Sequence, residues 1–96
     1  MQSRPPLTQV VIYSRPGCHL CDEMKALISR VAQSMPSRPV EIVEIDISGD
    51  PALEALYGLE IPVLLVEGKK AAKYRIAEVE LRKVLLARDA EGRRGR

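Results

Sequence analysis

The spacing of hydrophobic residues predicts four strands along this chain. A β-branched and aromatic run at residues 9–13 leads into Ser-Arg-Pro-Gly, which is typical of a buried strand that ends in a turn. A second strand is predicted at 40–47, a third at 63–66, and a fourth at roughly 71–74. Because only Glu-Gly-Lys and a few flanking residues separate the last two strands, we expect them to form a hairpin.

Three helical segments are predicted around these strands. From Cys18 onward, until Pro36 and Pro39 stop the helix, the apolar residues fall on one helical face, namely Leu20, Met24, Leu27, Ile28 and Val31. A short helix begins at Asp50-Pro51, where an N-cap residue precedes proline, and ends near Gly58. A last helix over about 77–89 is predicted to pack through Ala77, Leu81, Val84 and Leu85.

The order β-α-β-α-β-β-α predicts an α/β fold with a four-stranded mixed sheet and helices on both faces. The first two strands can pair in parallel through a right-handed crossover, whereas the last two form an antiparallel hairpin. In such a sheet, ligands and chemistry gather where parallel strands end and helices begin. Cys18 and Cys21 lie at such a point, directly after the first strand.

The charge of the chain gives little support for a nucleic-acid-binding function. The whole sequence has 15 basic and 13 acidic residues, and removing the three arginines and one glutamate of 91–96 leaves the rest neutral. Aromatic residues make up 3% of the chain, without Phe or Trp, so a platform for stacking bases is not expected. We therefore expect no nucleic-acid partner, and we interpret 90–96 as a basic, flexible tail.

At 96 residues the chain is expected to form one domain, over residues 9–89, preceded by an N-terminal extension at 1–8. The N-terminus lacks the apolar core of a secretory signal, and no apolar run approaches a membrane span. These features predict a cytoplasmic protein without a membrane partner. In that compartment thiols are kept reduced, so a close cysteine pair points to catalysis or metal binding rather than to a structural disulfide.

Cys18 and Cys21 have the spacing of an attacking and a resolving thiol. If Cys18 lies at the start of the helix, the free N–H groups and the positive end of the dipole stabilise its thiolate, and Arg15 adds a cation nearby. One helical turn brings Cys21 within bonding reach. Cys18 would attack a substrate disulfide, and Cys21 would then release the reduced substrate by attacking Cys18. We expect Cys21 to be the less exposed of the two.

Two stretches resemble members of the thioredoxin superfamily. YSRPGCHLC resembles the strand, turn and dithiol motif of glutaredoxins, and YGLEIPVLLVEGKKAAKY resembles the second half of thioredoxin-like domains. Together they cover most of residues 9–87. The resemblance implies a thioredoxin fold and a glutaredoxin-like dithiol–disulfide oxidoreductase.

The same resemblance implies roles for several residues. Pro62 falls where the family has a cis-proline facing the dithiol, and Ile61 would offer its backbone N–H and C=O to an extended substrate segment. With Arg15, these residues are the predicted substrate-binding set. His19 takes no role from the resemblance; by its own chemistry, beside the nucleophile, it either tunes the redox potential or is simply exposed at the helix start.

The expected substrates are disulfide-containing proteins or small thiols, with glutathione or a reductase as electron donor. No cofactor is expected, although glutathione is a candidate co-substrate. The segment EGKKAAKYRIAE lacks the Gly-Gly and acidic cluster with which glutaredoxins hold glutathione. Its cations, Lys69, Lys70, Lys73 and Arg75, are either partners for the glutathione carboxylates or a solvated basic hairpin.

Two other classes of function stay open at this point. Cys18 and Cys21 can bind a metal ion or an iron–sulfur cluster, but with His19 they supply at most three ligands, so a closed site needs ligands from outside the chain. We assign no metal ligand. The third possibility is a thioredoxin-like binding module whose cysteines do not turn over.

Overall fold

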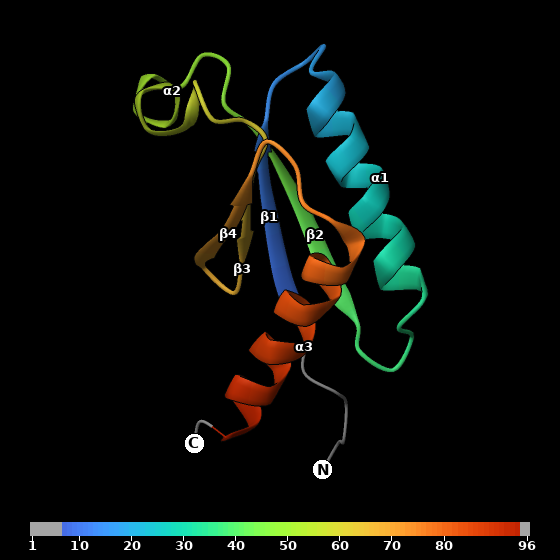
Figure 1. Ribbon diagram of the computed structural model, residues 1–96. Helices are drawn as coiled ribbons and strands as arrows, with labels where there is room; N and C mark the ends of the chain where they lie inside the picture. Colours follow the sequence, from blue (N-terminus) through green and yellow to red (C-terminus); the bar gives the residue numbers. More distant parts are fainter. Residues whose placement is uncertain (1–6, 95–96) are drawn as a thin grey trace.

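The computed structural model describes residues 7–94, with side chains described through Ala87 (Figure 1). The chain forms four strands and three helices in the predicted order, which are β1 (Thr8–Ser14), α1 (His19–Gln33), β2 (Val40–Asp46), α2 (Pro51–Tyr57), β3 (Val63–Val66), β4 (Lys69–Lys73) and α3 (Glu78–Arg94). Within the described part of the chain, no helix combines the length and the apolar composition needed to cross a membrane.

The largest differences from the predicted elements occur in the last third of the chain. β4 begins at Lys69, earlier than predicted, because Lys69 pairs directly with Val66 across the hairpin. α3 continues to Arg94, past the predicted end at residue 89 and into the segment interpreted as a tail. Arginine, glutamate and alanine are strong helix formers, and cations suit the C-terminal end of a helix dipole. Residues 95–96 and most of the N-terminal extension, 1–6, lie outside the described residues.

The sheet is mixed, with strand order β2-β1-β3-β4. β1 and β2 are parallel, while β3 runs antiparallel to both β1 and β4. In this register Ile12, near the end of β1, lies between Glu44 of β2 and Leu64 of β3. The carboxyl ends of β1 and β2 therefore meet at one edge of the sheet, beside the start of α1.

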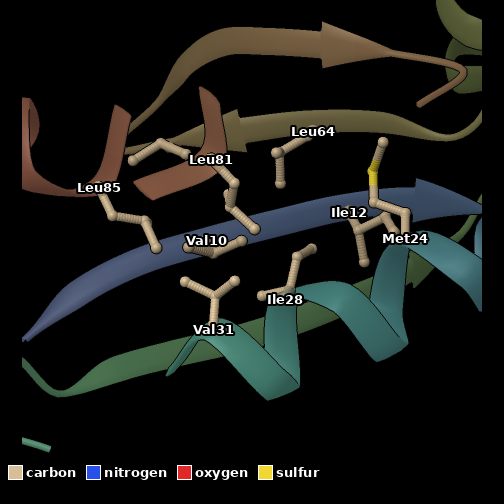
Figure 2. Close-up of a cluster of buried hydrophobic side chains, with 9 residues drawn as sticks. Val10, Ile12, Met24, Ile28, Val31, Leu64, Leu81 and Leu85 are labelled. Carbon is tan, nitrogen blue, oxygen red and sulfur yellow. The ribbon is translucent and has the colours of Figure 1, made fainter. Parts of the chain in front are cut away.

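α1 and α3 pack against the same face of this sheet, and their buried side chains form the core (Figure 2). This cluster joins β1 and β3 to both helices, through Val10, Ile12, Leu64, Val66, Met24, Ile28, Val31, Leu81 and Leu85. The predicted packing residue Ala77 is instead exposed, because α3 begins only at Glu78. The core fixes the axis of α1 against β1, and with it the position of the helix start that carries the cysteines.

α2 lies on the opposite side of the sheet, at the end of β1 (Figure 1). Side chains alternate along a strand, so Tyr13 points away from the face that Ile12 and Ser14 occupy. The Tyr13 ring stacks on Tyr57 of α2, with centroids 4.3 Å apart and an interplanar angle of 17°. Helices thus cover both faces, as predicted. None of the side chains of α2 is fully buried, so the helix is held in place by local contacts such as the stacking of Tyr57 on Tyr13.

Candidate active site

A tight turn connects β1 to α1 and places the first cysteine. Arg15 to Cys18 form this turn, with Pro16 and Gly17 at its centre. Gly17 has a φ of 79°, in the left-handed region that glycine adopts without the steric cost of a Cβ. Because the turn is so short, Cys18 becomes the N-cap residue of α1.

The two cysteines form a disulfide at the start of α1. Their Cα atoms are 5.2 Å apart. The Sγ atom of Cys18 accepts a hydrogen bond from the backbone N–H of Cys21, at 3.1 Å. Cys18 is half-buried, whereas Cys21 is 1% exposed, which confirms that Cys21 is the less accessible sulfur. Because Cys18 is the N-cap residue of α1, a thiolate at this position would lie close to the free N–H groups of the first helical turn.

Pro62 lies in the segment that joins α2 to β3, and the Ile61–Pro62 peptide bond is cis. Val63 pairs with Tyr13, so Pro62 is placed beside the end of β1, where the turn to the cysteines begins. The side chain of Pro62 is fully buried, and its carbonyl oxygen accepts a hydrogen bond from the N–H of Tyr74 at 2.9 Å. Ile61 is half-buried. Contact of Ile61 and Pro62 with a substrate stays a prediction.

Arg15 points from the turn toward α2. Its Nη2 atom donates to Oε1 of Glu54 at 2.9 Å and to the carbonyl oxygen of Gly58 at 3.2 Å. Sequence reasoning placed this cation near Cys18 without identifying these partners, because the carboxylate lies 39 residues away along the chain. His19 is exposed as the first residue of α1, and its role in tuning the redox potential stays a prediction.

A second polar cluster, which the sequence did not reveal, lies on the other side of the turn. The Ser14 hydroxyl donates to Oε2 of Glu44 at 2.7 Å, and Nζ of Lys25 lies 3.0 Å from the same oxygen. A hollow of about 300 Å³ lies between this cluster and Pro16-Gly17. The hydrogen bond from Ser14 and then that from Lys25 lower the pKa of Glu44. The cluster ties the end of β1 to β2 and α1.

The lowered pKa of Glu44 predicts a pH-dependent contribution to stability. A carboxyl group whose pKa is lower in the folded than in the unfolded state stabilises the fold above its unfolded pKa, and this contribution is lost as the pH falls through its folded pKa. Ser14→Ala is expected to raise the pKa of Glu44. Between neutral and acidic pH, the free energy of unfolding should then fall less in the variant than in the parent protein. An NMR titration of the carboxyl carbons in the parent protein and in Ser14→Ala measures the change in the Glu44 pKa.

Glu60 is the internal control in that titration. Its pKa is also lowered, but by a hydrogen bond from Lys70, so Ser14→Ala should leave it unchanged. An unchanged Glu44 pKa in the variant would show that the hydroxyl does not stabilise this carboxylate.

The sheet order, the two-sided helix arrangement and the disulfide at the start of α1 define a thioredoxin-like domain. Residues 9–86 match the family described as glutaredoxin-like domain (DUF836), and the chain belongs to this family. An uncharacterized protein of Mycobacterium tuberculosis is 30% identical over 84 residues, which covers 83% of this chain and 81% of that protein.

Solved structures agree with this assignment. The target protein XcR50 from X. campestris has a TM-score of 0.68 at 30% identity, over 81% of this chain and 96% of that one. Protein Ne2328 of Nitrosomonas europaea has a TM-score of 0.65 at 28% identity, over 88% and 98% of the two chains. Chloroplastic thioredoxin z reaches a TM-score of 0.68 at only 18% identity, over 88% and 80%, and this likeness shows the fold alone. The predicted thioredoxin fold is thus confirmed.

Proposed function

We propose that this protein is a dithiol–disulfide oxidoreductase that cycles Cys18 and Cys21 between the dithiol and the disulfide. One observation carries this proposal: the two sulfurs are bonded at the N-terminus of α1, and Cys18 Sγ accepts the N–H of Cys21. The same N–H group is available to a thiolate on Cys18 after reduction. Charge-assisted hydrogen bonds are stronger than neutral ones, so this geometry favours the thiolate over the thiol.

The reaction would proceed in two exchanges. The Cys18 thiolate attacks one sulfur of a substrate disulfide, the substrate S–S bond breaks, and the departing thiolate takes a proton from water. The Cys21 thiol then loses its proton and attacks Cys18 Sγ, which releases the second substrate thiol and closes the internal disulfide. Two electrons pass from the protein dithiol to the substrate. Two molecules of glutathione, or the dithiol of a reductase, would return them.

The burial of the two sulfurs supports this division of roles. Cys18 is half-buried and open to an incoming disulfide, whereas Cys21 at 1% exposure is shielded from other reactants. The Ile61-Pro62 segment lies beside the same strand end, which supports its role in binding an extended substrate segment.

A redox titration against glutathione tests the proposal. We expect a reversible two-electron couple between about −280 and −150 mV, the range of working thiol oxidoreductases. In Cys21→Ser, the pH dependence of Cys18 alkylation should show a thiol pKa below its free value of about 8.5. A pair that does not close reversibly, or a Cys18 thiol with an unshifted pKa, would contradict the proposal.

A further inference from the structure

The backbone of Arg15 lies close to that of Cys18, in the turn that precedes α1. The ends of a four-residue turn have Cα atoms within about 7 Å of each other, so Arg15 and Cys18 are neighbours across Pro16-Gly17. A guanidinium binds a carboxylate with strong, directional hydrogen bonds. A free Arg15 would therefore attract a disulfide that carries carboxylates to Cys18.

The structure shows that Arg15 is not free. Its Nη2 atom bonds both the Glu54 carboxylate and the Gly58 carbonyl oxygen, and its Nε is buried without a hydrogen-bond partner among the described residues. The Arg15 and Glu54 side chains are each 36% exposed, so water screens their attraction less than on an open surface. The guanidinium is fixed against α2 instead of being available to a ligand.

Residue 58 is a glycine, and the space that a side chain would take there is close to the Glu54 carboxylate that contacts Arg15. A Cβ on Gly58 would lie 2.8 Å from Oε1 of Glu54 and 2.6 Å from its backbone oxygen, closer than real Cβ atoms approach. A larger residue would displace the carboxylate that Arg15 contacts. The glycine at the end of α2 thus leaves room for the Glu54 carboxylate where it contacts Arg15.

We infer that Glu54 is a specificity-determining residue, which neutralises Arg15 and thereby makes Cys18 disfavour carboxylate-bearing disulfides relative to uncharged ones. This inference rests on the proposed function. An incoming carboxylate has to displace Glu54 from Arg15 or bind beside it, and the second case adds repulsion between like charges. An uncharged disulfide segment of a protein meets neither cost.

The first test compares two alkylating reagents on Cys18 in the Cys21→Ser background. Iodoacetate carries a carboxylate, whereas iodoacetamide is neutral; in both reactions the Cys18 thiolate displaces iodide and a carbon–sulfur bond forms. Because both reagents need the thiolate, the ratio of their rates does not depend on the Cys18 pKa. Glu54→Gln is expected to raise the iodoacetate-to-iodoacetamide ratio by about two- to fivefold, as releasing one partly exposed ion pair allows.

Two further variants separate the Arg15 effect from a general change of charge. Glu60→Gln removes the same charge from a nearby carboxylate that contacts Lys70 and Lys73, so its ratio should stay at the starting value. Arg15→Gln combined with Glu54→Gln should lose the gain. Salt near 1 M, where the Debye length is about 3 Å, should also remove it. An equal ratio in Glu54→Gln and Glu60→Gln would overturn the inference.

Single-turnover oxidation of the reduced protein then relates the inference to the proposed function. The rate constant for oxidation of the Cys18–Cys21 dithiol by glutathione disulfide, divided by that for bis(2-hydroxyethyl) disulfide, should rise in Glu54→Gln by a similar factor, and an unchanged ratio would contradict the inference. A parent protein that reduces neither disulfide would overturn the proposed function alone, since the alkylation ratio still decides the role of Glu54.

Discussion

Replacing Cys18 by serine is expected to abolish disulfide reduction, with turnover lower by a factor on the order of 10³ or more. A serine hydroxyl at the start of α1 can accept the same backbone hydrogen bond, so the helix cap is kept. It cannot supply a thiolate or form a mixed disulfide. The measurement is NADPH-coupled reduction of bis(2-hydroxyethyl) disulfide in the presence of glutathione and its reductase.

Cys21→Ser is the matched variant, because it removes the resolving sulfur but leaves the nucleophile. It should react once with a protein disulfide and accumulate a mixed disulfide on Cys18, which intact-mass spectrometry detects and which a reducing agent removes. If Cys18→Ser kept its activity, or if the adduct formed only in Cys18→Ser, the assigned order of attack would be wrong.

Ile28→Ala is expected to lower the free energy of unfolding by about 2–5 kcal/mol. Ile28 is fully buried between α1 and the sheet, where it packs in the same cluster as Val10 and Leu81 (Figure 2). Truncation removes buried methyl groups and leaves a cavity that its neighbours only partly fill. A domain of this size has roughly 5–15 kcal/mol of stability, so the loss is a large fraction of the total.

Urea unfolding monitored by circular dichroism measures this effect. With a typical slope of about 1–3 kcal/mol per molar urea, the midpoint should fall by roughly 1–3 M. Leu56→Ala is the control, because Leu56 is 65% exposed on α2 and its loss should change the midpoint little. Equal midpoints for the Ile28 and Leu56 variants would show that α1 does not depend on this packing.

Local sequence predicted the parts of the site that adjoin each other in the chain. The strand, the Pro-Gly turn and the start of α1 follow from residues 9–24, and together they place Cys18 at the helix N-cap with Cys21 one turn away. Chain connectivity alone imposes this arrangement, since a strand, a four-residue turn and a helix leave the first cysteine little choice of position. The third strand at 63–66, with Pro62 just before it, was also predicted correctly, because a short apolar run of neighbouring residues indicates it.

The parallel pairing of the first two strands was predicted, but the side-chain contacts between distant segments were not. Glu44 bonds Ser14 only because β1 and β2 pair in one parallel register, and a shift of one residue would turn Glu44 to the opposite face. Glu54 reaches Arg15 only because α2 is placed at the end of β1, where Tyr13 also stacks on Tyr57. The spacing of hydrophobic residues along the chain does not indicate which of these side chains pair.

The sequence by itself therefore determined the order of elements and the presence of a dithiol pair at a helix start, because each depends on short-range spacing, and its resemblance to glutaredoxins implied the thioredoxin-like architecture. Tertiary structure decided which charges surround that pair. Arg15 was interpreted as a cation for Cys18 or its substrate, and the fold pairs it with Glu54 of α2. Side-chain partners depend on sheet register and helix packing, which are properties of the whole chain, so the electrostatics of this site became visible only in the folded protein.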